Sequence, residues 1–245
     1  FDLRHEARWS NGDSVTAANF VDGLRRALDP GTSSGAADLL RAIENAPAIL
    51  KGELPVDQLG VRALDEWTLE IRLSHAVPYF PDILTNTVAS PLHPSSVEES
   101  GGFSRPGSTV SNGPYSLAAF APGANLVLKR NARYWDSAAV EFDEVRYQFV
   151  SDENAEFTRF RSGEIDVTNT VPEQRFQELL GKRDPRLQHR STLATFYFTL
   201  NTDHGPLSGK RGLREALSLA VNRSVITDSV TRAGQVPAYS LVPAD

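Results

Sequence analysis

The sequence predicts an α/β fold, and three observations support this prediction. The stretch from Trp9 to Phe20 combines a turn, a helix cap and the start of an amphipathic helix. Apolar residues between positions 61 and 73 alternate with polar ones, as they do in half-buried strands. From position 115 onward, strand-like stretches are followed by helical patterns, the order that builds a sheet covered by helices. Together these patterns predict a chain of alternating strands and helices.

The first helix is predicted to begin after Thr16. Asn11-Gly12 favours a turn before it, because glycine accepts a positive φ freely and asparagine tolerates one. The Thr16 hydroxyl can accept a bond from an early backbone N–H of the helix. One apolar stripe then follows at the spacing i, i+4, i+7 and i+8: Phe20, Leu24, Ala27 and Leu28. Asp29-Pro30-Gly31 ends this helix.

A second helix and a hairpin are predicted next. Helical spacing recurs in Ala36, Leu39, Leu40 and Ile43, and Gly52 with Pro55 closes that segment. Two strands, 61–63 and 69–73, flank Asp65-Glu66 as a hairpin turn. Prolines and a polar loop from Gly101 to Ser111 follow, and they predict a domain border near 91–95.

The second half of the chain is predicted to alternate strands and helices. Strands are expected at 115–120, 126–129, 145–149, 165–167 and 195–200, the last of them buried because it is the most β-prone run. Helices are expected from a cap at Ser151 or Asp152 to Gly163, from Pro172 to Gly181, at 213–220, and from 225 to Gly234.

Composition excludes several classes of protein. A net charge of −6 and a pI near 5.4 argue against a nucleic-acid binder, which needs a clustered basic face. No apolar run approaches the length of about 20 residues that a spanning helix requires. Cysteine is absent, which excludes disulfides and thiolate chemistry. The five histidines show no metal-binding spacing, so neither a metal nor another cofactor is predicted.

Nine short motifs, in order, resemble those of the extracytoplasmic oligopeptide-binding proteins of ABC importers, solute-binding protein family 5. They are Trp9–Phe20, Leu59-Gly60-Val61, Thr68-Leu69-Glu70, Val77-Pro78-Tyr79-Phe80, Asn112-Gly113-Pro114-Tyr115, Arg130-Asn131 with Tyr134-Trp135, Ser162-Gly163-Glu164-Ile165-Asp166, Leu213-Arg214-Glu215-Ala216-Leu217, and Pro237-Ala238-Tyr239-Ser240. The resemblance spans essentially the whole chain, but the chain corresponds only to the middle of such proteins.

The resemblance implies a fold and a division into domains. The expected fold is that of a type II periplasmic binding protein with an extra inserted domain, here incomplete. Residues 1–93 would form most of the inserted α/β domain, 94–193 the central part of lobe one, and 194–245 the beginning of lobe two.

The resemblance also implies a function. The protein would not be an enzyme: it would capture oligopeptides between two lobes and deliver them, as a monomer, to the permease of an ABC importer. Its location would be the periplasm, or the cell surface as a lipoprotein. The chain shows no signal peptide at Phe1, so we expect that segment to have been removed or to lie outside this sequence.

Three residues are predicted to contact the ligand. Asn169 and Thr170 follow the predicted strand 165–167 and match a segment that lines the cleft in relatives, although they also suit an ordinary turn. Tyr197 matches a cleft-facing tyrosine, and a core aromatic is an equal alternative. The tyrosine that oligopeptide relatives carry after Asp-Pro-x-Thr is replaced near Ala36, so we expect the size of the ligand or the shape of its pocket to differ.

Two other functions stay open. The same fold binds other solutes, such as dipeptides, nickel chelates or sugars. A different class is suggested by Gly31-Thr32-Ser33-Ser34-Gly35, which matches the G-x-S-x-G nucleophile elbow of hydrolases. That elbow needs a strand before the serine, whereas Ser33 follows a predicted helix. A turnover assay on ester and peptide substrates separates the two classes.

Overall fold

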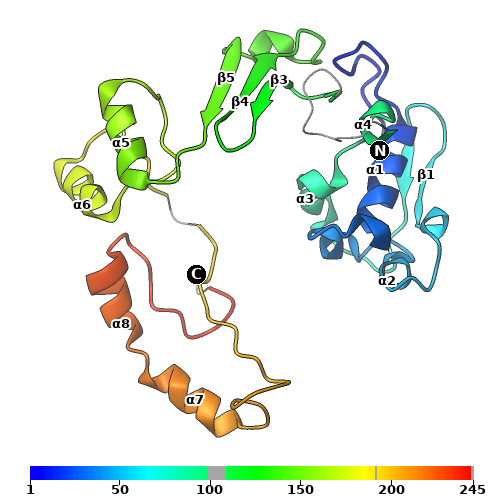
Figure 1. The fold of residues 1–245 in the computed structure, drawn as a ribbon. Coiled ribbons are helices and arrows are strands. Elements are labelled where there is room, and N and C mark those ends of the chain that lie inside the picture. The colour runs from blue at the N-terminus through cyan, green and yellow to red at the C-terminus, as the bar shows by residue number, and fades with distance from the viewer. Residues whose placement is uncertain (99–108, 191, 244–245) are drawn as a thin grey trace. The chain divides into compact units, whose positions relative to one another are not determined.

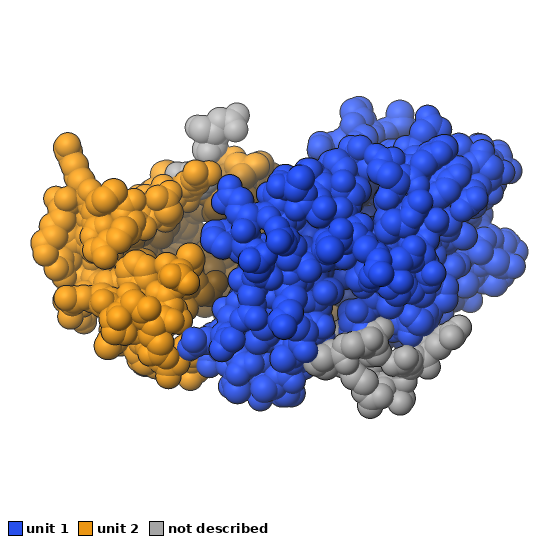
Figure 2. Space-filling model, turned by 90° about the horizontal axis from the view of Figure 1, so that it is seen from above, with its two compact units in different colours: residues 1–149 blue, residues 150–245 orange. Residues whose placement is uncertain are grey.

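The structure is a computed structural model that describes residues 1–98, 109–190 and 192–243. The chain divides into two compact units, residues 1–149 and residues 150–245, and each is described by itself (Figures 1 and 2). The predicted borders at 93 and 193 refer to the lobes of a longer fold, and they stay a prediction. Most of the predicted loop between Gly101 and Ser111 lies outside the described residues.

The core of unit 1 is built around helix α1 (Ala17–Leu28), which begins and ends as predicted. The stripe that the sequence predicted turns inward, since Leu24, Ala27 and Leu28 are buried. Helix α1 packs against strand β1 (Val61–Ala63), strand β2 (Leu69–Ile71) and the 3₁₀ turn Thr87–Ala89 (Figure 1). These elements close one apolar core with the short helices α2 (Ala46–Leu50) and α3 (Phe80–Ile83).

The prediction of one continuous second helix is wrong. Residues Ala37–Leu40 form a 3₁₀ turn, and α2 begins separately at Ala46. Between them Asn45 adopts a left-handed conformation with φ of 68°, which a continuous helix does not allow. Pro47 then lies in the first turn of α2, the place where a helix tolerates proline. The predicted apolar residues therefore lie in the 3₁₀ turn or beside it, where Leu40 and Ile43 are buried and Leu39 is exposed.

The predicted hairpin is confirmed, because β1 and β2 pair in antiparallel register, Val61 opposite Ile71. Asp65 Oδ1 closes the connection by accepting the backbone N–H groups of Trp67 and Thr68, each at 2.8 Å. The N-terminal residues extend along β2, with the backbone N–H of Leu3 bonded to the carbonyl of Trp67 at 2.8 Å. Helix α4 (Ser95–Glu98) follows in the same unit.

Unit 1 also contains an antiparallel sheet of three strands in the order β3-β4-β5 (Figure 1). These strands, Tyr115–Ala121, Asn125–Arg130 and Glu144–Gln148, confirm the three predicted between 115 and 149. Pairing places six apolar side chains on one face: Leu117, Phe120, Leu126, Leu128, Val145 and Tyr147. Leu117 and Phe120 share that face despite their odd spacing, because a bulge at Ala118 inserts one unpaired residue.

Unit 2 contains four helices among its described residues: α5 (Glu153–Ser162), α6 (Glu173–Lys182), α7 (Arg211–Ala220) and α8 (Arg223–Val225), which continues as a π-helix at Ile226–Thr231. Asp152 caps α5 as predicted, and Gly163 ends it with a φ of 77°. Helix α6 ends at Lys182 and is capped by Arg183, which has a φ of 51°. The predicted end, Gly181, lies inside the helix.

The strands predicted at 165–167 and 195–200 are wrong. Neither segment is a strand, and the described part of unit 2 contains no strand with which one could pair. Because a strand is stabilised by the ladder it joins, high β-propensity alone does not form one. The predicted burial of 195–200 fails with it, since Phe196 is 90% exposed and Phe198 is 84% exposed. No helix of the described residues is long and apolar enough to cross a membrane.

Candidate functional site

The motif at the start of the chain is organised by one buried carboxamide. Asn19, which is 8% exposed, accepts hydrogen bonds through Oδ1 from the indole N–H of Trp9 at 3.1 Å and from the backbone N–H of Thr16 at 2.9 Å. The Thr16 hydroxyl lies 3.3 Å from the same oxygen. Thr16 is the N-cap of α1, as predicted, and Asn19 supplies the returning bond of a capping box. The carbonyl of Asn19 also accepts the backbone N–H of Leu92 at 3.0 Å.

The same motif joins the helical layer of unit 1 to the segments that flank the sheet. Ser10 and Ser111 bond reciprocally, the backbone N–H of Ser10 to the carbonyl of Ser111 at 2.7 Å and the N–H of Ser111 to the Ser10 hydroxyl at 3.1 Å. Arg133 donates to the Ser10 carbonyl at 2.7 Å. Buried Asn131 donates to the carbonyl of Gly113 at 2.9 Å. These motif residues therefore build the scaffold.

His93 holds the turn that precedes α1. Its Nε2 lies 2.9 Å from Asp13 Oδ2, and its Nδ1 lies 2.7 Å from the Ser95 hydroxyl. The ring also stands edge-on to Trp9, with centroids 5.3 Å apart. Because the backbone N–H of Ser95 donates to Nδ1 at 3.3 Å, the neutral ring carries its proton on Nε2 and donates it to Asp13.

Asp13, His93 and Ser95 align like a hydrolytic triad, but the surrounding groups support a structural role. The Nδ1 lone pair that would activate the Ser95 hydroxyl already accepts the Ser95 backbone N–H. The next two backbone N–H groups, of Ser96 and Val97, are bonded to the carbonyls of His93 and Pro94. They are therefore not free to stabilise an oxyanion. The cluster joins the turn at residues 11–13 to the segment that leads into α4.

This cluster predicts a pH dependence of stability. The hydrogen bonds from His93 and Asn11 hold the pKa of Asp13 below its ordinary value. A lowered folded-state pKa stabilises the protein at pH values above the unfolded pKa of about 4, and the stabilisation is lost as the pH falls through the folded value. We expect urea midpoints of the wild type to fall more steeply than those of Asp13→Asn below about pH 4. Parallel slopes would contradict this role.

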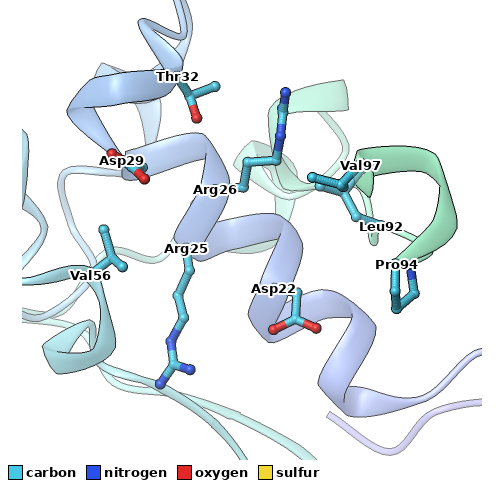
Figure 3. A pocket seen from close by; sticks show the side chains of 9 residues that line it. All are labelled: Asp22, Arg25, Arg26, Asp29, Thr32, Val56, Leu92, Pro94 and Val97. Carbon is cyan, nitrogen blue, oxygen red and sulfur yellow. The ribbon is translucent and has the colours of Figure 1, made fainter. Parts of the chain in front are cut away.

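A hollow of about 430 Å³ lies beside α1 (Figure 3). Its lining includes Asp22, Arg25, Arg26 and Asp29, so charges of both signs balance around it. Arg25 and Arg26 extend in opposite directions from the helix (Figure 3). Arg25 Nη2 also donates to the carbonyl of Asp57 at 3.2 Å. This surface does not gather one kind of charge around one point, so it favours no particular ligand.

The predicted ligand residues Asn169 and Thr170 lie on an exposed segment of unit 2 between α5 and α6. The backbone N–H of Asn169 donates to Glu156 Oε1 in the first turn of α5, at 3.0 Å. Both side chains are exposed, so they are accessible to a ligand. Sequence reasoning missed Glu156, because only the folded chain shows that residue 169 returns to the beginning of the helix.

Tyr197 lies in segment 195–200, which has no regular secondary structure, and it is 61% exposed. The core-aromatic alternative is therefore not realised in unit 2. Within the described residues, no hydrogen bond or ring contact joins Tyr197 to Asn169 or Thr170.

Ser33 follows the 3₁₀ turn Pro30–Thr32, where a nucleophile elbow would have a strand, and its hydroxyl donates to the Pro30 carbonyl at 3.4 Å. The described residues hold no group of three or more His, Cys, Asp or Glu side chains suited to a metal ion.

Comparison with known proteins covers the whole chain. The family model "Bacterial extracellular solute-binding proteins, family 5 Middle" matches residues 1–245. The periplasmic oligopeptide-binding protein OppA of Salmonella typhimurium is 39% identical over 247 residues, covering 99% of this chain and 45% of the relative. The chain thus spans about half the length of this relative.

Solved structures agree with the sequence comparison. The structure of Burkholderia pseudomallei OppA is similar with a TM-score of 0.92 at 34% identity, and it covers 99% of this chain and 48% of that one. Haemophilus influenzae OppA in complex with RPPGFSPFR gives a TM-score of 0.92 at 32% identity, with the same coverage.

Proposed function

This chain belongs to the family 5 bacterial extracellular solute-binding proteins, and from that premise we propose that it is the middle part of a protein that captures oligopeptides for an ABC importer. The predicted fold, an incomplete periplasmic binding protein, is confirmed by its similarity to about half of each OppA structure. The observation that carries the proposal is the TM-score of 0.92 to an OppA in complex with RPPGFSPFR.

The proposal extends to the parts of the molecule. Residues 1–93 belong to the inserted domain, 94–193 to lobe one and 194–245 to lobe two. Asn169, Thr170 and Tyr197 contact the peptide, and their exposure in the structure supports this assignment. The protein is a monomer without catalytic activity, and a permease receives its ligand. It works in the periplasm or as a lipoprotein on the outer side of the cytoplasmic membrane.

Binding by this fragment is expected to be far weaker than binding by the full-length protein. A micromolar complex needs about −8 kcal/mol after the costs of ordering and association, and a cleft reaches it by enclosing the ligand between two walls. Residues 165–170 and 195–200 supply exposed segments of such walls. Calorimetry on both proteins with several peptides should give micromolar or tighter binding for the full-length protein and at least about 100-fold weaker binding for the 245-residue chain. Equal affinities would contradict the proposal.

Variants of the full-length protein test the residue assignment in the same experiment. Asn169→Ala and Tyr197→Ala should weaken the binding of different peptides by similar factors, because contacts to a peptide backbone do not depend on its side chains. Tyr79→Ala is a matched control, since Tyr79 is 62% exposed in unit 1. Binding of a dipeptide, nickel chelate or sugar, but of no longer peptide, would favour another solute.

A further inference from the structure

The segment that carries Asn169 and Thr170 returns along helix α5. Gly163 ends the helix in a left-handed conformation, and the backbone N–H of Glu164 bonds to the carbonyl of Arg159 at 2.9 Å. Six residues after the turn, the chain has reached the first turn of the same helix, where Glu156 Oε1 accepts the N–H of Asn169. The two ends of α5 therefore fix the two ends of this segment.

Within the described part of the chain, one hydrogen bond attaches the backbone of residues 165–171 to the rest of the protein, the bond that Asn169 donates to Glu156. Phe157 is buried beside Glu156, so the carboxylate extends from a turn that is itself packed in unit 2. Ordering a free segment costs conformational entropy, and the hydrogen bond from Asn169 to Glu156 restricts the backbone at the predicted ligand residues.

We propose that Glu156 is a positioning residue for peptide binding: it holds Asn169 and Thr170 in the conformation that meets the ligand. This inference rests on the proposed function. The bond to Glu156 occupies the backbone N–H of Asn169, which leaves the Asn169 carboxamide and the groups of Thr170 for the peptide. Glu156 itself contacts the protein and not the ligand.

Three variants of the full-length protein separate positioning from charge. Glu156→Ala removes the acceptor, and we expect peptide affinity to fall about tenfold, the change that ~1.4 kcal/mol produces. Glu156→Gln keeps an oxygen acceptor without the charge and should bind within about twofold of the wild type. Glu153→Ala removes the same charge from the same turn, where no bond to residues 165–171 exists among the described residues, and it should also bind normally.

Two further measurements distinguish positioning from general stability. Hydrogen exchange at the Asn169 amide should accelerate in Glu156→Ala and not in Glu153→Ala, while both variants keep the same thermal midpoint. Wild-type affinity in Glu156→Ala, an equal loss in Glu156→Gln, or a lower midpoint in Glu156→Ala alone would overturn the inference. If the wild-type full-length protein binds no peptide, the proposed function fails instead, and unchanged exchange at Asn169 would still reject positioning by Glu156.

Discussion

Replacing Asn19 with leucine is expected to lower the free energy of unfolding by about 3 kcal/mol. The leucine has a similar size but no acceptor, so the buried indole N–H of Trp9 and the partly buried backbone N–H of Thr16 lose their partner. An unsatisfied buried donor costs about 1–3 kcal/mol, and the partly buried donor adds a smaller loss. Urea unfolding of the 245-residue chain, followed by tryptophan fluorescence, measures the effect.

Asn19→Asp is the matched control for this prediction. Aspartate keeps the oxygen that receives the donors, and hydrogen bonds of this kind favour its charged form. We expect a loss of less than about 1.5 kcal/mol at neutral pH, roughly half that of the leucine variant. If both variants are equally unstable, the NH₂ group or the neutrality of the carboxamide matters more than its acceptor oxygen, and the loss of the two acceptor bonds is not the cause.

Gly23→Ala is expected to destabilise the chain by about 2 kcal/mol, against the normal preference of a helix for alanine. A Cβ at position 23 would lie 2.5 Å from the backbone carbonyl oxygen of Ser90 and 3.4 Å from Pro91 Cα. The contacting atoms belong to the backbone, so the segment at 90–92 must move away from α1. That movement strains the bond between the carbonyl of Asn19 and the N–H of Leu92.

Gly181→Ala is the comparison variant, and we expect it to raise the stability of the chain where Gly23→Ala lowers it. Gly181 also lies within a helix, but a Cβ there meets no atom within 4 Å. Alanine should therefore stabilise α6 by about 0.5–1 kcal/mol. The thermal unfolding midpoints of the two variants, compared with that of the wild type, test both predictions. A stabilised Gly23→Ala would show that α1 and the segment at 90–92 separate at little cost.

Short sequence patterns predicted those parts of the fold that depend only on residues close together in the sequence. The α1 stripe, the turn at Asp65, and the cap and terminator of α5 each depend on residues close in sequence, and the structure confirms them. The second helix failed because Asn45 adopts a conformation that apolar spacing does not reveal. The strands at 165–167 and 195–200 failed because pairing requires a neighbour.

The candidate site was only partly accessible to sequence reasoning. Asn169, Thr170 and Tyr197 were predicted from resemblance to the family, and the structure shows all three exposed. The roles of Asn19 and Glu156 depend on which N–H groups the fold brings to their oxygens. The spacing of residues in the sequence does not reveal these hydrogen bonds, because asparagine and glutamate are ordinary residues in the first turn of a helix.

The extra residue in β3 affects how this strand can change in length. Leu117 and Phe120 are three positions apart, and a regular strand would direct them to opposite sides. Because Ala118 is unpaired in the bulge, Leu117 and Phe120 lie on the same face of the sheet. Deletion of Ala118 would leave a regular strand with Leu117 and Phe120 still on one face of the sheet. Deletion of Val127 from β4 would instead move the side chain of every later residue in that strand to the opposite face. Strand β3 can therefore lose Ala118 without any change in its pattern of polar and apolar residues.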